Sequence, residues 1–263
     1  MNVGTGNAKG SNVINDFNEN DFDPDFWRGC VMARDFPHDT RDSSITNGGK
    51  WDVFFWPSTS GVSSDTNNWP SISGSRGQVR GPNKNCPIEI QPLTNVKADV
   101  LETLDDMEAR GTTHINLGAV WGFRVLSPKK PFKQGLPYDE PNFNKAAIIM
   151  TDGDNFISSD EFSISAYGAL QDGVLGTTDK SDAEDELDDR LTTVCNRMKN
   201  KGILIYTITF QVSSSSTRDL MEDCATTPEQ NTLILRRPRN WMMSSKPSAP
   251  NSAIYELAAD RIS

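Results

Sequence analysis

A short apolar run in the middle of the chain leads directly into a cluster of oxygen ligands. The run Ala146–Thr151 continues as Thr151-Asp152-Gly153-Asp154-Asn155. Carboxylate and hydroxyl oxygens are the ligands that Mg²⁺, Mn²⁺ and Ca²⁺ prefer, and ligands of open parallel sheets bind beyond the carboxyl ends of the strands. Asp152 is therefore the leading candidate for a binding residue. An ordinary Asp-Gly turn is the competing interpretation, because many strand–helix connections use that pair.

A second group of hydroxyls precedes a predicted helix. The segment Gly111-Thr112-Thr113-His114-Ile115-Asn116-Leu117-Gly118 joins one helix-period run to the next and places Thr112 and Thr113 at a helix N-terminus. A hydroxyl in that position can contribute to a metal site, and it can equally cap the helix by accepting a hydrogen bond from the backbone. The residues alone leave both interpretations open.

The elements that must position these groups lie in the second part of the chain. Helices are predicted from Thr94 to Gly111, from Ile115 to Leu126, and from Ser181 to Lys201, the last with Ser181 and Glu184 as a capping box. A strand covered on both faces is predicted at 146–151, a second buried strand at 203–212, and shorter helices at 218–225 and 254–262. This order predicts an α/β fold with a doubly wound, mainly parallel sheet.

Residues 1–92 differ in composition from the rest. They are rich in Gly, Pro, Ser, Asn and Asp, with short aromatic islands and no helix-period segment. We therefore predict three regions: a disordered polar segment at 1–25, a loop-rich insertion pinned by aromatic side chains at 26–92, and the α/β core at 93–263.

The charge balance restricts the class of partner. With 36 acidic and 26 basic residues the formal net charge is −10, which argues against nucleic acid, since phosphate neutralisation needs clustered Lys and Arg. No run approaches the roughly 20 apolar residues of a membrane span, and residues 1–20 lack the apolar core of a signal peptide. We expect no membrane span and no signal peptide in this chain.

The chain has four cysteines, Cys30, Cys86, Cys195 and Cys224, in no CxxC arrangement. Four buried thiols and two disulfides in an oxidising compartment both fit this number.

The two oxygen-rich segments together resemble the von Willebrand factor A (VWA) fold. The metal-ion-dependent adhesion site of that family uses a DxSxS motif after the first strand, a Thr from a Gly-Thr loop, and an Asp from a strand that ends in Thr-Asp-Gly. By this resemblance Asp152 matches the Asp and Thr113 matches the Thr, with Thr112 as the alternative. The complete family site holds a divalent cation (Mg²⁺, Mn²⁺ or Ca²⁺).

The resemblance narrows to TadG-like proteins of Flp (tight-adherence) pilus assembly. The matching segments occur in the expected order between residues 26 and 225. They are Trp27-Arg28-Gly29-Cys30-Val31-Met32-Ala33-Arg34, similar to WxGCVxAR; Gly81-Pro82-Asn83 leading to Cys86; Trp121-Gly122-Phe123-Arg124-Val125-Leu126-Ser127-Pro128 with Pro131-Phe132; Lys145 to Asn155; and Arg218-Asp219-Leu220-Met221 leading to Cys224-Ala225.

Two features depart from the family pattern. The family carries its DxSxS strand upstream of the Gly-Cys-Val segment, and no such strand is recognisable here. Asp42-Ser43-Ser44-Ile45-Thr46 has the spacing DxSxT, but polar residues precede it where an apolar strand is required, so we interpret it as a decoy. The family's N-terminal membrane helix is also missing, and we expect the chain to be the C-terminal part of a longer product whose VWA/Rossmann-like sheet is incomplete at its N-terminus.

The resemblance implies a non-enzymatic protein-interaction or adhesion module of the periplasm or cell envelope. It favours two disulfides, Cys30–Cys86 and Cys195–Cys224, and protein partners such as pilus assembly or envelope components, with a membrane anchor in a full-length relative. Because Asp152 and Thr113 are only part of the family's ligand set, we expect weak metal binding or none in this chain. The incomplete sheet also predicts an unpaired edge that invites association.

Two other functions compete with this one. The first is a secreted or surface interaction protein unrelated to pili. The second is a metal-dependent hydrolase that uses Asp152, Asp154, Asp160 and Glu161, with His114 as its sole candidate base. The chain has no nucleophile elbow, HExxH or phosphate loop, and a solvent-facing loop position is expected for His114.

Overall fold

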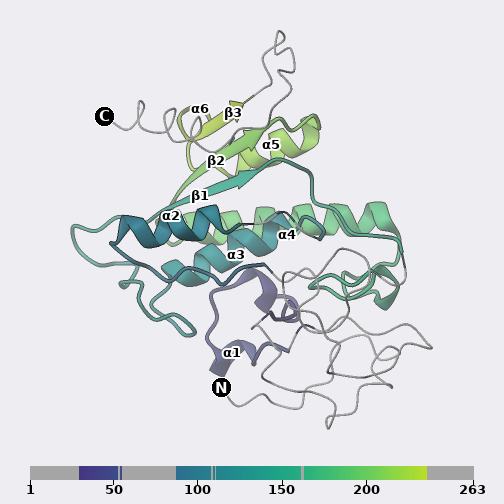
Figure 1. Cartoon of the computed structure of the whole chain (residues 1–263), viewed down its shortest axis with the longest axis horizontal. Helices are drawn as coiled ribbons and strands as arrows, with labels where there is room; N and C mark the ends of the chain where they lie inside the picture. Colours follow the sequence, from purple (N-terminus) through teal and green to yellow (C-terminus); the bar gives the residue numbers. More distant parts are fainter. Residues whose placement is uncertain are drawn as a thin grey trace.

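A three-stranded parallel sheet forms the centre of the computed structural model, which describes residues 30–52, 54, 87–107, 109, 111–160 and 163–235. The strands are β1 (Ala146–Thr151), β2 (Leu204–Phe210) and β3 (Thr232–Leu235), in the spatial order β1-β2-β3 (Figure 1). In the register Ile148 lies opposite Tyr206, and Thr209 lies opposite Ile234. The sequence did not predict β3, because four residues are too few to show an alternating pattern.

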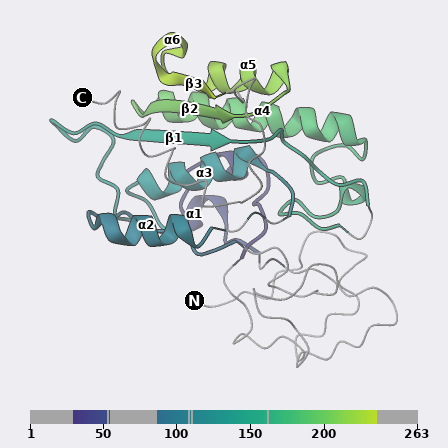
Figure 2. The ribbon, with the colours of Figure 1, turned by 45° about the horizontal axis from the view of Figure 1, so that its top comes forward.

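One face of the sheet carries three helices: α3 (Ile115–Leu126), α4 (Lys180–Lys199) and α5 (Ser215–Cys224) (Figure 2). The crossovers β1–α4–β2 and β2–α5–β3 place α4 and α5 side by side, as same-handed connections require. Their apolar sides and the inward residues of the strands form the main core. Its fully buried members include Val120, Phe123, Leu191, Val194, Met198, Ile205 and Met221.

The remaining elements are short. They are the 3-10 helices η2 (His38–Thr40) and η4 (Leu170–Asp172), and the helices α1 (Ile45–Gly48), α2 (Lys97–Asp105) and α6 (Pro228–Asn231). Among all the helices of the described part, none has the length and apolar composition that crossing a membrane requires.

The other face of the sheet is open, and this corrects the prediction that β1 is covered on both faces. Ile148 is 67% exposed and Met150 54%. Leu204 and Tyr206 on the same face of β2 are each 39% exposed. Within the described ranges the fold is therefore mixed α/β with helices on one face of a parallel sheet, and a doubly wound arrangement is not seen there.

The starts of three helices differ from their predictions. Helix α5 begins at Ser215 instead of at residue 218, because Ser214 is its N-cap and accepts a hydrogen bond from the backbone N–H of Thr217 (3.2 Å). Helix α4 begins one residue earlier than Ser181, because Asp179 is the N-cap and accepts hydrogen bonds from the backbone N–H groups of Ser181 (2.8 Å) and Asp182 (3.2 Å). The carboxylate of Glu184 pairs with Lys180 rather than closing a capping box. Helix α2 begins at Lys97, after Thr94 Oγ1 accepts from the N–H of Val96.

Two arginines hold the segment around residues 38–43 against the α/β core by donating hydrogen bonds to its backbone carbonyls. Arg34 donates to the carbonyls of His38 (3.1 Å) and Ser43 (3.0 Å), and Arg124 on α3 donates to those of His38 (3.1 Å) and Arg41 (3.2 Å). Both guanidinium groups also stack on the ring of Trp51. Burial, with the Arg34 charge beside it, lowers the pKa of Arg124 to about 9. Two segments quoted for the family resemblance thus meet through structural contacts.

Asp42 is held in a buried polar cluster. Its carboxylate accepts hydrogen bonds from Tyr138 (2.7 Å), Ser127 (2.9 Å) and Lys129. Burial alone would raise the pKa of Asp42, but these hydrogen bonds outweigh it and lower the pKa. The residues before it form η2 rather than a strand, so Asp42 is not at the end of a strand.

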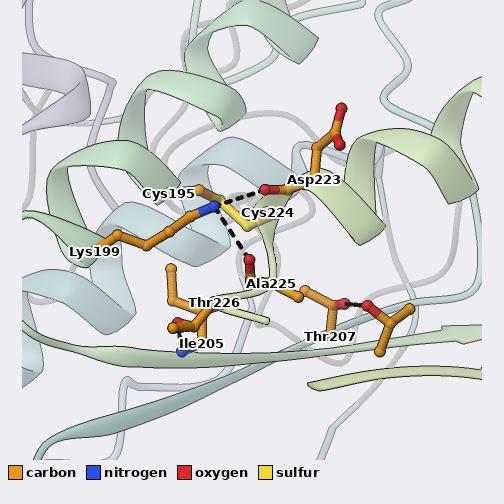
Figure 3. The surroundings of a disulfide bond; sticks show 9 residues. Cys195, Lys199, Ile205, Thr207, Asp223, Cys224, Ala225 and Thr226 are labelled. Carbon is orange, nitrogen blue, oxygen red and sulfur yellow. Dashed lines mark hydrogen bonds between the residues drawn. A yellow bond between two sulfur atoms is a disulfide. The ribbon is translucent and has the colours of Figure 1, made fainter. Parts of the chain in front are cut away.

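The disulfide Cys195–Cys224 joins α4 to α5, with 5.3 Å between the two Cα atoms, and it confirms that predicted pair. Figure 3 shows Lys199 beside it, where Nζ donates to the carbonyls of Asp223 (2.7 Å) and Ala225 (3.1 Å) at the end of α5. Cys30 is also disulfide-bonded. Its predicted partner Cys86, like the predicted segment 1–25 and the predicted helix 254–262, lies outside the described residues.

Candidate functional site

The two oxygen-rich loops lie next to each other. The N–H of Phe156 donates to the carbonyl of Thr113 at 2.9 Å. The side-chain Oδ1 of Asn155 accepts from the N–H of Ile115 at 2.7 Å, at the start of α3. These hydrogen bonds hold the loop after β1, which carries Asp152, against the loop before α3, which carries Thr113. The two loops lie together at the carboxyl end of the sheet.

Asp152 is exposed at the first position beyond β1. The turn beneath it is closed by Thr151, whose Oγ1 lies 2.7 Å from the carbonyl oxygen and 3.2 Å from the amide nitrogen of Gly153. Thr112 and Thr113 are both half-buried. Thr112 Oγ1 lies 3.1 Å from Nε2 of His114, within hydrogen-bonding distance.

His114 is not the solvent-facing residue that its place in a loop suggested. Its Nδ1 is buried with no partner in the described part of the chain, and its ring lies 5.7 Å from that of Tyr167. This burial lowers the pKa of His114 to about 4. The imidazole is therefore neutral at pH 7, and its buried Nδ1 cannot reach a substrate in solvent.

Two further groups at this end of the sheet were not predicted. Thr217 at the start of α5 donates to Asp154 at 2.6 Å, and Asn155 donates to Asp188 on α4 at 2.7 Å. Burial, together with the carboxylates of Asp185, Asp154 and Asp189, raises the pKa of Asp188. In the sequence Asp188 is one of many acids in the first half of α4, so nothing there distinguishes it.

The chemistry available at this surface is that of a few oxygen donors. In the described ranges there is no group of three or more His, Cys, Asp or Glu side chains that could hold a metal ion. Asp152 and Thr113 would supply one carboxylate and one hydroxyl, whereas Mg²⁺ takes six ligands and Ca²⁺ six to eight. The loop pair is thus an acidic, hydroxyl-bearing surface. Glu161, a candidate of the hydrolase alternative, lies outside the described residues.

No protein-family model, curated protein or solved structure matches this chain.

Proposed function

We propose that this chain is a non-catalytic, VWA-like protein-interaction module of a TadG-like protein, acting in Flp pilus assembly at the bacterial cell envelope. The ordered segments between residues 26 and 225 support the family, and the Cys195–Cys224 disulfide supports an oxidising compartment such as the periplasm. The partners we propose are pilus assembly or envelope proteins.

The contact between the two loops is the observation that best supports this proposal. The backbone hydrogen bond from Phe156 to Thr113 and the Asn155–Ile115 contact join two loops that the resemblance assigns to one binding site. An exposed carboxylate at the end of a parallel strand, beside a Thr-bearing loop, is the arrangement that a metal-dependent adhesion surface needs. The half-buried His114 is neutral at pH 7, because desolvation lowers its pKa to about 4.

A divalent cation, if bound, would be held by Asp152 and Thr113, with Thr112 as the alternative, and it would offer open coordination positions to an oxygen ligand of the partner. Because two protein ligands are few for a cation that dehydrates reluctantly, we expect a dissociation constant for Mg²⁺ or Mn²⁺ of about 1 mM or weaker in isothermal titration calorimetry. Asp152→Ala should then change the titration little. Micromolar affinity that disappears in Asp152→Ala would show that the site is more complete than proposed.

Deleting the gene for this chain in its own bacterium tests the proposed role in pilus assembly. Flp pili and surface adherence should be lost in the deletion strain and restored by the wild-type gene on a plasmid. A deletion strain with normal pilus numbers and normal adherence would refute the assignment and favour an interaction protein unrelated to pili.

A further inference from the structure

The face of the sheet opposite helices α3, α4 and α5 is apolar across all three strands. Alternate residues of a strand share one face, and the register continues this face from β1 to β3. Ile148 and Met150 on it are more than half exposed. A contiguous apolar patch on a protein surface marks an interaction site. We call this surface the outer face, and it consists of Ala146, Ile148, Met150, Leu204, Tyr206, Ile208, Phe210, Leu233 and Leu235.

Helix α2 carries a second exposed apolar surface. Val96, Val100 and Leu104 recur every four residues, so they lie along one side of the helix. Their exposed fractions are 48%, 39% and 37%, and Met107 just beyond the helix is exposed as well. Lys97 borders this side, and its long side chain can turn the ammonium group to solvent. We call Val96, Val100, Leu104 and Met107 the α2 stripe.

We propose that the α2 stripe of one copy of this chain packs on the outer face of a second copy, and that the exchange is reciprocal and forms a two-fold dimer. The two surfaces match in chemistry, because neither contains a charged side chain. They also match in size. The nine residues of α2 are about 14 Å long and the six residues of β1 about 20 Å, and three strands are about as wide as one helix.

The exposure of both surfaces favours a second copy over the same chain. If α2 covered the outer face of its own chain, Val100 and Ile148 would be buried, and both are exposed. A second copy can bring the two surfaces together with no change in fold, which is the usual case for protein association. Own-chain coverage requires α2 to move about residues 106–114, and the N–H of Phe156 holds the end of that connection at the carbonyl of Thr113.

Reciprocal exchange also explains why association stops at two copies. Each dimer contains two helix-on-sheet contacts, and both surfaces of both copies are then covered. The formal net charge of −10 opposes association, but these charges lie outside the contact and salt screens them, with a Debye length of about 8 Å at physiological ionic strength. The dimer does not rest on the proposed function, since Asp152 and Thr113 belong to neither surface.

Three single variants of the full chain test the dimer by analytical ultracentrifugation at about 0.3 M NaCl. The wild type should sediment as a dimer at roughly 50 µM. Val100→Asp and Ile148→Asp each place a charge in the contact and should raise the dimer dissociation constant at least about tenfold. Ala98→Asp, an exposed position on the opposite side of α2, should change it less than about twofold.

Three outcomes of this experiment would overturn the proposal. They are a wild type that stays monomeric, a species larger than a dimer, and equal effects of Val100→Asp and Ala98→Asp. Circular dichroism checks that the variants fold, as we expect because the replaced side chains are exposed.

Covalent trapping gives a second measurement that does not depend on an added charge. A mixture of the Val100→Cys and Ile148→Cys proteins should form a disulfide between the two chains on mild oxidation, whereas a mixture of Ala98→Cys and Ile148→Cys should do so much less. Non-reducing electrophoresis and peptide mapping identify the product. In the double variant Val100→Cys/Ile148→Cys, a disulfide within one chain would assign the outer face to α2 of the same copy and overturn the proposal.

Discussion

Replacing Arg190 by methionine should lower the free energy of unfolding by about 3–5 kcal/mol, the usual cost of leaving a buried charge unpaired. Arg190 on α4 places Nη1 2.5 Å from Oδ2 of Asp39, and the two side chains are 5% and 0% exposed. In the variant the hydroxyl of Tyr167, at 3.2 Å, remains as a donor to that carboxylate. A neutral donor does not replace the lost positive charge.

Urea unfolding at pH 7 measures this loss, and two further variants act as controls. Lys180→Met breaks the pair with Glu184, whose side chains are 38% and 25% exposed, and it should cost less than about 1 kcal/mol. Asp39→Leu combined with Arg190→Met removes both charges and should recover part of the loss. An Arg190→Met variant that is no less stable than Lys180→Met would contradict a structural role for the buried pair.

Removing the disulfide between α4 and α5 should cost about 3–4 kcal/mol, from the loop-closure entropy of a 29-residue separation. The variant Cys195→Ala/Cys224→Ala leaves the Cys30 disulfide in place. Both sulfurs belong to buried residues, 1% and 2% exposed, so the loss also includes packing around the pair. Thermal and urea unfolding of this variant, compared with the wild type, give the value.

Reduction separates the contribution of this disulfide from that of Cys30. Dithiothreitol should destabilise the wild type more than it destabilises Cys195→Ala/Cys224→Ala, because the variant has one disulfide fewer to lose. If the reductant lowers the stability of both proteins by the same amount, the α4–α5 disulfide contributes nothing to the folded state.

The elements that the sequence predicted best are those with strong local signals. Helix α3 and strand β1 have the predicted bounds, because Ser127-Pro128 ends the helix and the apolar run ends at Asp-Gly. Which segments bury the two faces of β1 could not be predicted in this way. An apolar run such as Ala146–Thr151 indicates that both faces ought to be buried, but it does not say which other segment buries them.

The candidate site could be predicted only in part, for a physical reason. Asp152 directly follows strand β1 and Thr113 lies just before helix α3, and at such boundaries the residue type indicates a possible binding role. The contacts that bring their loops together depend on Asn155, an amide that bonds to Ile115 on one side and Asp188 on the other. Such contacts join residues far apart in the sequence, and no periodicity or spacing encodes them. For the same reason the burial of Nδ1 of His114 could not be predicted from the sequence.

The most direct test of the central proposal is photo-cross-linking at the carboxyl end of the sheet in living cells. A photoreactive p-benzoylphenylalanine replaces Asp152 in one strain, and in a control strain it replaces Lys201, an exposed residue just before β2 at the opposite end of the sheet. The proposal predicts that position 152 captures a Flp pilus or envelope-assembly protein, identified by mass spectrometry, and that position 201 does not. Equal capture from both positions, or capture of no such protein from position 152, would contradict it.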